Sequence, residues 1–537
     1  MLLLSVEWVW GVSLWVWLRP VRHSFALTLL SVSYLFSLTY NVYTFGVLAV
    51  FSDPPNLYND ITALLSSAGP LARNLGIPFY WYLLTVVGLL LLGLLCVMLL
   101  RQLLLASDAL KRPSRIALLV LCGLTVPLAS AFLFNTPRPL YLSHTVAVKL
   151  VRNLTHSAAS RQQVLLIEQT GPQLQAAYDY NGSVWREKPD VYVIALESYG
   201  DALLQWDEIR PKYTQRLTTL DQTLADADWH RATTRSNAPI RGGKSWLSYT
   251  TLLFGLKINS DSQYEALRDY FQSADYPHLG NTFRAQGYAS WRYTPLHIEA
   301  SDEQLVHSTQ NLNNYDHWLT LKDSEPFDGW RYGWGPTPPD QYSLWFLREQ
   351  AQQKTPNQPR LHFMITHNSH RPWGDQPPLV ADWHMLNNPI GNAPFIGTRG
   401  GQHSKDGYWS AIDYQLRMVV DFIVKGPDNA VYVVIGDHQP PFIAFDDYEG
   451  AATPLHIIAK NKTLVAQFVK AGFSIGLTPS LTNKTINHEG FYSLFMQQWL
   501  ATYATNTQPA PSVCPNGLIF THTLSTDSCT IKVETSP

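Results

Sequence analysis

An uncharged apolar stretch near the N-terminus limits what this chain can fold into more than any other feature. Between Phe79 and Leu100 no residue carries a charge, and a run of this length is typical of a helix that crosses the hydrocarbon core of a membrane. Charged residues make up 15% of the chain, below the usual value of about a quarter, and the deficit is concentrated near the N-terminus. The length of 537 residues indicates two or three folding units. The sequence therefore predicts a membrane region joined to a large folded part.

Apolar runs within residues 1–134 predict an N-terminal α-helical transmembrane bundle of about four spans. The runs are 3–18, Phe25–Phe51, Phe79–Leu100 and Ile116–Phe134. The first run is short for a span. No basic segment precedes it and no small-residue cleavage site follows it, so we do not expect a cleaved signal peptide. Residues 135–188 are mixed and polar, which favours a stalk or interfacial helical connector.

Basic residues in the short loops set the expected orientation of the bundle. The loops after the first and third spans carry Arg19, Arg22, His23, Arg101, Lys111, Arg112 and Arg115. The loop after the second span carries Asp53 and Asp60 against Arg73. Because basic loops stay in the cytoplasm, we expect the long C-terminal part outside the membrane. An odd number of spans would invert this orientation.

The four cysteines fall into two kinds. Cys96 and Cys122 lie in apolar runs, where a thiol behaves as a small hydrophobic group. Cys514 and Cys529 lie in a polar tail, residues 506–537, which we expect to be peripheral. These two form either a disulfide, which requires an oxidising compartment, or two free surface thiols. A disulfide would agree with an extracytoplasmic location.

From Pro189 onward, apolar strand-like runs alternate with helical patterns. The runs are 191–197, Leu361–Thr366, 430–436 and Pro454–Ala459, and the helical patterns are Ser248–Leu256, Thr282–Gly287 and Trp409–Ile423. This alternation predicts an α/β domain over residues 189–505, with a mostly parallel sheet covered by helices on both faces.

Two of the predicted strands end on residues that can bind a metal. The run that starts at Ala430 ends on Asp437 and His438, and the run that starts at Asp190 ends on Glu197. In an open α/β sheet, ligands bind at the carboxyl ends of the strands. Taken alone, Gly-Asp-His is equally consistent with an Asp that caps a helix and an exposed His. A second predicted strand that ends on a carboxylate, Glu197, favours a metal site instead.

A third element reads Arg-Gly-Gly-Lys-Ser and ends at Ser245, before a helical pattern. The glycines leave room for a phosphate, and a helix start offers free N–H groups and the positive end of its dipole. Lys244 adds positive charge. A nucleotide P-loop is disfavoured because position 238 is Ala238 rather than Gly. A glycine turn with a serine cap remains the plain structural alternative.

Together these elements predict one site made of Glu197, Ser245, Asp437 and His438. Two carboxylates and an imidazole suit Zn²⁺ or Mn²⁺. The metal would lower the pKa of the Ser245 hydroxyl until it attacks phosphorus.

The order of the motifs, Glu-Ser at a strand tip, then Gly-Lys-Ser, then Gly-Asp-His, resembles the membrane-bound sulfatase-like branch of the alkaline phosphatase superfamily. Its lipoteichoic acid synthases and lipid A phosphoethanolamine transferases have an N-terminal membrane bundle and an extracytoplasmic α/β domain. The resemblance covers roughly residues 189–500. It implies a metal-bound Glu197, a nucleophilic Ser245, and Asp437 with His438 as the Asp-His pair. Ser245 stands where the lipoteichoic acid synthases have Thr in a Gly-Lys-Thr segment.

The same resemblance implies substrate-binding residues in the segment Thr-His-Asn-Ser-His-Arg-Pro-Trp. The family places a phosphate-binding His before a Pro-aromatic pair, and His370 matches it. His367 is a second candidate, for phosphate or for a second metal. Arg371 either holds a phosphate oxygen or lies on the surface. Trp334, followed by Gly and with Asp340 nearby, resembles the family's Trp-Gly segment near the glycerol-phosphate pocket.

The expected function is transfer of a phospholipid head group, phosphoglycerol or phosphoethanolamine, to a hydroxyl of a glycan, lipid or polymer. Ser245 would be the nucleophile, with Lys244 and His370 assisting, outside the cytoplasmic membrane of a bacterium. A phosphodiesterase- or phosphatase-type hydrolase and a catalytically inactive membrane scaffold are the alternatives. A sulfatase is disfavoured because Ser245 is not followed by x-Pro-x-Arg, and a net charge of −2 disfavours nucleic-acid binding.

Overall fold

The computed structural model of the chain describes residues 24–51, 54–62, 79–106, 111–117, 146–180, 182–271, 275–295, 303–332, 337–388, 404–441, 450–505, 512–521 and 528–533, with residues 15, 120 and 443. The chain divides into two compact units. The first comprises Met1–Ala49 with Pro54–Arg161, and the second comprises Val50–Asp53 with Gln162–Pro537. The boundary falls inside helix α6 (Val146–Gln175), within the segment for which we predicted a connector.

The first unit contains the long apolar helices α2 (Ser24–Phe51) and α4 (Phe79–Ala106), where two spans were predicted. By length and composition, Phe25–Leu48 is the one helix among the described residues that could cross a membrane, and Leu91–Ala106 is a shorter apolar helix. The predicted run 3–18 and most of Ile116–Phe134 lie outside the described residues, so the count of four spans stays a prediction.

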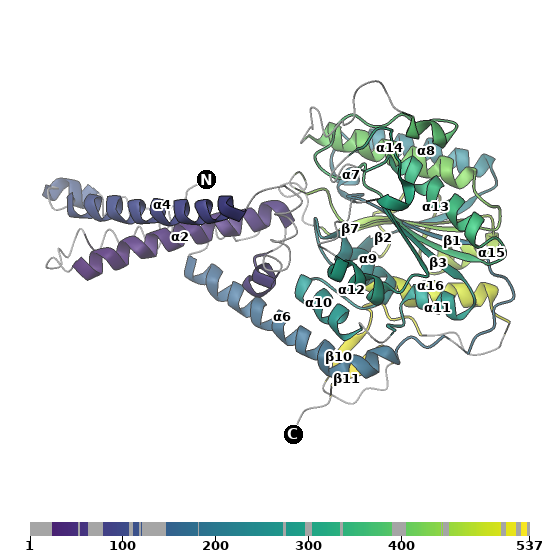
Figure 1. Cartoon of the computed structure of the whole chain (residues 1–537), viewed down its shortest axis with the longest axis horizontal. Helices are drawn as coiled ribbons and strands as arrows, with labels where there is room; N and C mark the ends of the chain where they lie inside the picture. The colour runs from purple at the N-terminus through teal and green to yellow at the C-terminus, as the bar shows by residue number, and fades with distance from the viewer. Residues whose placement is uncertain are drawn as a thin grey trace. The chain divides into compact units, whose positions relative to one another are not determined.

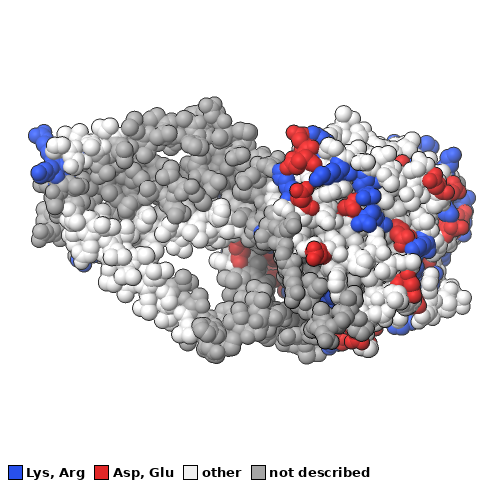
Figure 2. Space-filling model, turned by 90° about the horizontal axis from the view of Figure 1, so that it is seen from above, with Lys and Arg blue, Asp and Glu red and all other residues white. Residues whose placement is uncertain are grey.

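Helix α2 is apolar on its outside and polar where it contacts α6. Phe25, Leu29 and Phe36 are exposed. Tyr40 is buried, and its hydroxyl accepts a hydrogen bond from Asn153 Nδ2 (3.1 Å). Figure 2 shows that the described surface of this unit is mostly uncharged, with basic side chains gathered at one end, whereas acidic and basic side chains are interspersed over the second unit. This inverted polarity is typical of helices that face lipid.

The second unit is built on a sheet that has nine strands among the described residues. They are β1 (Val191–Leu196), β2 (His230–Asn237), β3 (Ala289–Thr294), β4 (His317–Thr320), β5 (Arg360–Ile365), β6 (Val431–Gly436), β7 (Ala452–Ala459), β8 (Ser474–Ile475) and β9 (Ile486–Asn487). Their order is β4-β3-β5-β1-β6-β7-β2-β8, with β9 beside β2. Neighbours from β4 to β6 are parallel, while β6–β7, β7–β2 and β2–β8 are antiparallel.

Helices cover both faces of this sheet, as predicted (Figure 1). One face carries α7 (Ala202–Gln205), α8 (Arg210–Asp226), α13 (Asp340–Lys354) and α14 (Lys405–Val424). The other carries α9 (Ser245–Phe254), α10 (Asp261–Tyr270), α11 (Leu279–Ala285), α12 (Glu303–Asn313), α15 (Lys462–Lys470) and α16 (His488–Tyr503). Successive residues of β1 enter opposite cores, Val193 on the α9 face and Ile194 on the α13 face. Each such buried side chain contributes about 1.5–3 kcal/mol.

The described part of the C-terminal tail, residues 512–521 and 528–533, packs against the domain, whereas we expected the tail to be peripheral. Cys514 and Cys529 form a disulfide. Leu518 lies in the core, and its N–H donates to the Gly255 carbonyl oxygen (2.8 Å) at the end of α9. The tail forms a two-stranded sheet from β10 (Ile519–Thr521) and β11 (Thr530–Lys532). The Cys514 N–H donates to Ser493 Oγ of α16 (2.8 Å), and Ile531 is buried in the same core.

Candidate active site

Two of the predicted site residues follow neighbouring parallel strands. β1 and β6 are paired in register, with Leu196 opposite Gly436, so Glu197 and Asp437 leave the sheet side by side. Glycine is required at 436 because a Cβ there would lie 1.8 Å from the Tyr199 carbonyl oxygen. The carboxyl edge of the parallel strands therefore gathers two carboxylates.

Helix α9 brings Ser245 to the same edge. Ser245 is the first residue of the helix, and Ser248 donates its hydroxyl to the Asp437 carbonyl oxygen. Ser245 Oγ lies 3.1 Å from Glu197 Oε2 and 3.1 Å from His438 Nε2. The structure thus brings Glu197, Ser245, Asp437 and His438 into one cluster.

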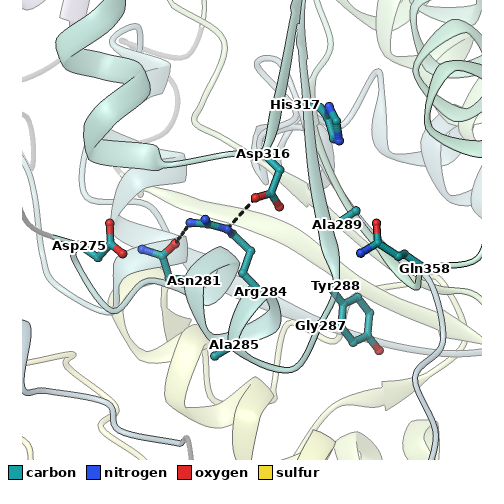
Figure 3. Close-up of a pocket in the computed structure, with 10 residues that line it drawn as sticks. All are labelled: Asp275, Asn281, Arg284, Ala285, Gly287, Tyr288, Ala289, Asp316, His317 and Gln358. Carbon is teal, nitrogen blue, oxygen red and sulfur yellow. Dashed lines mark hydrogen bonds and ion pairs between the residues drawn. The ribbon is translucent and has the colours of Figure 1, made fainter. Parts of the chain in front are cut away.

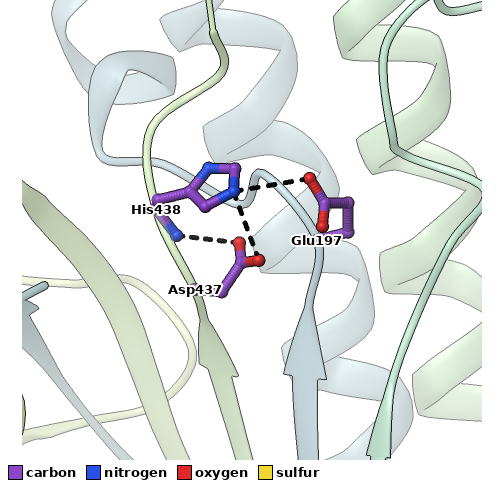
Figure 4. A group of neighbouring side chains, drawn as sticks. All are labelled: Glu197, Asp437 and His438. Carbon is purple, nitrogen blue, oxygen red and sulfur yellow. Dashed lines mark hydrogen bonds and ion pairs between the residues drawn. The ribbon is translucent and has the colours of Figure 1, made fainter. Parts of the chain in front are cut away.

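Glu197, Asp437 and His438 are close enough to hold one cation (Figure 4). One ligand atom from each lies within 4.8 Å of the others, and the side chains are buried. His438 Nε2 is 3.5 Å from both Glu197 Oε1 and Asp437 Oδ2. His438 Nδ1 donates to the Gln439 carbonyl oxygen (2.8 Å), which leaves Nε2 as the nitrogen with a lone pair.

One buried oxygen tests whether these residues fit a metal. Asp437 Oδ1 accepts hydrogen bonds from the N–H groups of Ser198 (2.7 Å) and His438 (2.8 Å). Asp437 Oδ2 is equally buried, and no described residue donates a hydrogen bond to it. Buried carboxylate oxygens are normally paired or coordinate metals. Two carboxylates and an imidazole are ligands of Zn²⁺ and Mn²⁺, so the residues fit a divalent metal.

The two carboxylates hold protons very differently. Burial and the neighbouring Glu197 charge raise the pKa of Asp437 well above its ordinary value. Burial opposes ionisation of Glu197 too, but the imidazoles of His438 and His370, the Ser198 hydroxyl and the His367 imidazole outweigh it and lower its pKa to about 2. With no cation bound, Asp437 therefore takes up a proton more readily than Glu197 does. A divalent cation would favour the ionised form of both.

Two non-glycine residues with a left-handed backbone flank the cluster. Ser198, with φ of 58°, directly follows Glu197, and Lys244, with φ of 56°, directly precedes Ser245. This conformation costs a residue with a Cβ roughly 1–2 kcal/mol. Strained residues of this kind gather at functional sites, where the surrounding structure holds them. Their position favours a functional site over a plain glycine turn.

The predicted catalytic Lys244 is half-buried and forms an ion pair with a buried carboxylate. Its Nζ lies 2.7 Å from Asp261 Oδ2, at the start of α10. This pair fixes the residue that directly precedes Ser245, which supports a positional role. A direct role of Lys244 in the transfer stays a prediction.

The loop after β5 carries His367 and His370 close enough to Glu197 for both imidazoles to stabilise its charge. His367 is buried, and its Nε2 has no hydrogen-bond partner among the described residues. His370 and Arg371 are both half-buried. His370 Nδ1 donates a hydrogen bond to the Arg371 carbonyl oxygen (2.6 Å). Trp334 lies outside the described residues, so its role stays a prediction.

Sequence reasoning missed the residues that hold this loop in place. Thr366 Oγ1 accepts the Glu197 N–H (3.0 Å), and Ser369 Oγ donates to the Glu197 carbonyl oxygen (2.6 Å). Asp340 accepts the His367 N–H (2.8 Å). Thr366 and Ser369 could have been found from the sequence as hydroxyl residues next to the end of a predicted strand. The sequence suggested Asp340 only as a neighbour of a substrate pocket.

A surface hollow of about 620 Å³ lies at the opposite end of the sheet, by the first residues of β3 and β4 (Figure 3). Its Arg284 is bonded to Asp316 (2.9 Å) and Asn281 (3.0 Å). These polar groups satisfy one another, so the hollow offers less chemistry than the Ser245 cluster.

No family model and no curated protein matches the sequence. Several solved structures are similar to it. The integral membrane lipooligosaccharide phosphoethanolamine transferase A (EptA) of Neisseria meningitidis is 12% identical, with 91% of this chain and 94% of that chain covered and a TM-score of 0.46. The lipoteichoic acid synthase LtaP of Listeria monocytogenes is 15% identical, with 53% and 71% covered and a TM-score of 0.35. The phosphoglycerol transferase GacH of Streptococcus pyogenes, solved with sn-glycerol-1-phosphate, is 15% identical, with 62% and 81% covered and a TM-score of 0.34.

The similar structures include phosphoethanolamine and phosphoglycerol transferases. Lipoteichoic acid synthases and phosphoethanolamine transferases are also the enzymes that the order of the sequence motifs resembles. At these identities and TM-scores, the roles of residues in this chain rest on its own geometry.

Proposed function

We propose that this chain is a membrane-anchored, metal-dependent transferase of the sulfatase-like branch of the alkaline phosphatase superfamily. It would move a phosphoglycerol or phosphoethanolamine head group from a phospholipid to a hydroxyl of a glycan, lipid or polymer. The observation that carries the proposal is the position of Ser245 Oγ, 3.1 Å from both Glu197 Oε2 and His438 Nε2. A serine hydroxyl beside buried carboxylates and an imidazole suits nucleophilic attack on phosphorus.

The transfer takes two displacements at phosphorus. Ser245 Oγ attacks the donor phosphodiester, the P–O bond to diacylglycerol breaks, and a head-group phosphodiester of Ser245 forms. The acceptor hydroxyl then attacks the same phosphorus and the P–Oγ bond breaks. The Ser245 proton ends on diacylglycerol and the acceptor proton returns to Ser245. His370, beside the cluster, is the group that we propose to orient the phosphate and carry the proton.

Glu197, Asp437 and His438, with Ser245, would hold Zn²⁺ or Mn²⁺. Such an ion lowers the pKa of a bound hydroxyl and so makes a nucleophile available at neutral pH. Ser198 supports the ligand set, because its N–H fixes one Asp437 oxygen and its hydroxyl donates to Glu197 Oε1 (2.8 Å).

The proposed location is the extracytoplasmic side of a bacterial cytoplasmic membrane, with several spans anchoring the chain. The apolar, outward-facing helices of the first unit support membrane attachment. The disulfide between Cys514 and Cys529 supports an oxidising compartment for the second unit. Anchoring would keep the site within reach of lipid head groups.

Peptide mass spectrometry of Ser245 tests the proposal. Full-length protein in detergent would be incubated with Mn²⁺ or Zn²⁺ and either phosphatidylglycerol or phosphatidylethanolamine. We expect the Ser245 peptide to gain the mass of the head-group phosphate, and the mass to name the donor. Lipid turnover without modification of Ser245, or no turnover with either metal, would contradict the proposal.

A labelled head group distinguishes the transferase from a hydrolase of the same fold. Transfer delivers the label to an added acceptor alcohol, whereas hydrolysis releases it as the free phosphate ester. A protein that binds no metal and turns over neither lipid would be a scaffold.

A further inference from the structure

We infer that Asp340 is a positioning residue of this site, whose carboxylate sets the conformation of the loop from His367 to His370. The inference deepens the proposed function and rests on it, because His370 in this loop is the group proposed to orient the substrate phosphate.

Asp340 joins α13 to the loop by bonds in both directions. Its Oδ1 accepts the His367 N–H (2.8 Å) and its Oδ2 accepts the Asn368 N–H (2.7 Å). In return, Asn368 Oδ1 accepts the Asp340 N–H (2.7 Å). Gln415 Nε2 of α14 also donates to Asp340 Oδ2. The carboxylate is fully buried, so water does not compete for these bonds.

The other side of the loop is bonded to the β1 tip. Ser369 Oγ donates to the Glu197 carbonyl oxygen (2.6 Å), and Trp373 Nε1 donates to the Ser369 carbonyl oxygen (2.8 Å). The loop is therefore held between Glu197 and Asp340. Losing Asp340 would release the side that carries the His367 and Asn368 amides, while the metal ligands keep their own supports.

A carboxylate is chemically specific at this position. Among the described residues, no Lys or Arg forms an ion pair with Asp340, and a buried charge without a cation is costly. Burial raises the pKa of Asp340 to about 6, while two successive N–H groups, a side-chain amide and the start of α13 favour the ionised form. An asparagine has one acceptor oxygen, so its NH₂ group would face an N–H donor.

Asp190 provides a matched control at the amino ends of β1 and β5. It too is a buried carboxylate, and it accepts the Arg360 N–H (2.8 Å) and pairs with the Arg360 guanidinium (2.9 Å). Its hydrogen bonds and ion pair join β1 to β5 at the end of the sheet opposite the site.

The test compares full-length D340N and D190N with the wild type by three measurements: metal content, the rate at which Ser245 takes up a head group, and hydrogen exchange of the peptide that holds His367 and Asn368. For D340N we expect metal content to stay at the wild-type level, the uptake rate constant to fall at least tenfold with a raised KM for lipid, and amide exchange in the loop to accelerate. D190N should lose thermal stability and keep its uptake rate.

N368A is a second variant in case D340N does not fold. It removes only the hydrogen bond from the Asp340 N–H to Asn368 Oδ1, so we expect a smaller, roughly threefold loss of the head-group uptake rate. Wild-type uptake in both D340N and N368A, or an equal loss in D190N, would overturn the inference. If the wild type itself takes up no head group, the proposed function fails. Hydrogen exchange would still test whether Asp340 holds the loop. Unchanged exchange of the His367 and Asn368 amides in D340N would reject that role.

Discussion

Ser245 Oγ lies 3.1 Å from His438 Nε2, although the two residues are 193 positions apart in the sequence. The contact exists because α9 begins at the carboxyl edge of the sheet, directly beside the end of β6. His438 Nδ1 is bonded to a carbonyl oxygen, so its Nε2 lone pair faces the serine. A serine held between this nitrogen and Glu197 Oε2 is the geometry on which the proposed chemistry depends.

Replacing Ser245 with Ala should abolish turnover and leave metal binding in place. Only the attacking oxygen is lost, while Glu197, Asp437 and His438 remain. We expect the rate of head-group transfer to fall at least about 1,000-fold. Lipid turnover and metal content measured on the same sample check this. S480A, at a half-buried serine whose hydroxyl accepts the Thr482 and Asn483 N–H groups, is the control and should keep full activity. Turnover retained in S245A would remove Ser245 from the mechanism.

Removing the metal should lower thermal stability, and D437N should remove this dependence. Asp437 Oδ2 has no hydrogen-bond donor among the described residues, so a cation is its natural partner. At a free metal concentration of 100 times Kd, binding adds about 2.7 kcal/mol to the free energy of unfolding. Thermal melts with and without chelator, for wild type and D437N, check the difference. An equal response of both proteins to the chelator would argue against this ligand set.

Gly436→Ala should disable the site by displacing the end of β6. The added Cβ would lie 1.8 Å from the Tyr199 carbonyl oxygen, and a backbone atom cannot move aside alone. We expect a loss of about 1–3 kcal/mol in the free energy of unfolding and at least a tenfold loss of turnover. G182A is the control, since a Cβ there meets no atom within 4 Å. Equal behaviour of the two variants would show that β6 tolerates the shift.

Acid should destabilise the second unit through buried neutral histidines. Burial lowers the pKa of His456 to about 3, although Asp221 opposes this change. Because the unfolded chain then binds more protons than the folded one, stability is complete above pH 6.5 and falls as the pH drops toward 3. A pKa that is lower by one in the folded chain than in the unfolded chain corresponds to about 1.4 kcal/mol of stability lost in acid.

Melting temperatures measured from pH 8 to pH 4 check this dependence. His456→Gln removes one such group and should flatten the dependence, whereas H384Q, at an exposed histidine, should not. If melting temperature falls equally with decreasing pH in H456Q and in the wild type, other groups cause the acid sensitivity.

The local pattern of apolar and polar residues was enough to predict which strand ends lie together. Apolar β-branched runs predict strands, and β1, β5, β6 and β7 are found where they were expected. A parallel sheet brings the carboxyl ends of such strands to one edge, so the residues directly after them, Glu197 and Asp437, were predictable neighbours. The glycine turn before a helical pattern likewise indicated Ser245.

Tertiary structure decided what no local pattern carries. Strand β2 is polar, and its Thr233 and Ser236 are buried because they bond to His456 (2.8 Å) and His488 (2.8 Å), residues more than 200 positions away. The same holds for Asp340, whose role comes from two amides that lie 27 and 28 residues later. A polar side chain becomes part of a core or a site only when the fold supplies its partner, and the sequence around it does not reveal that partner.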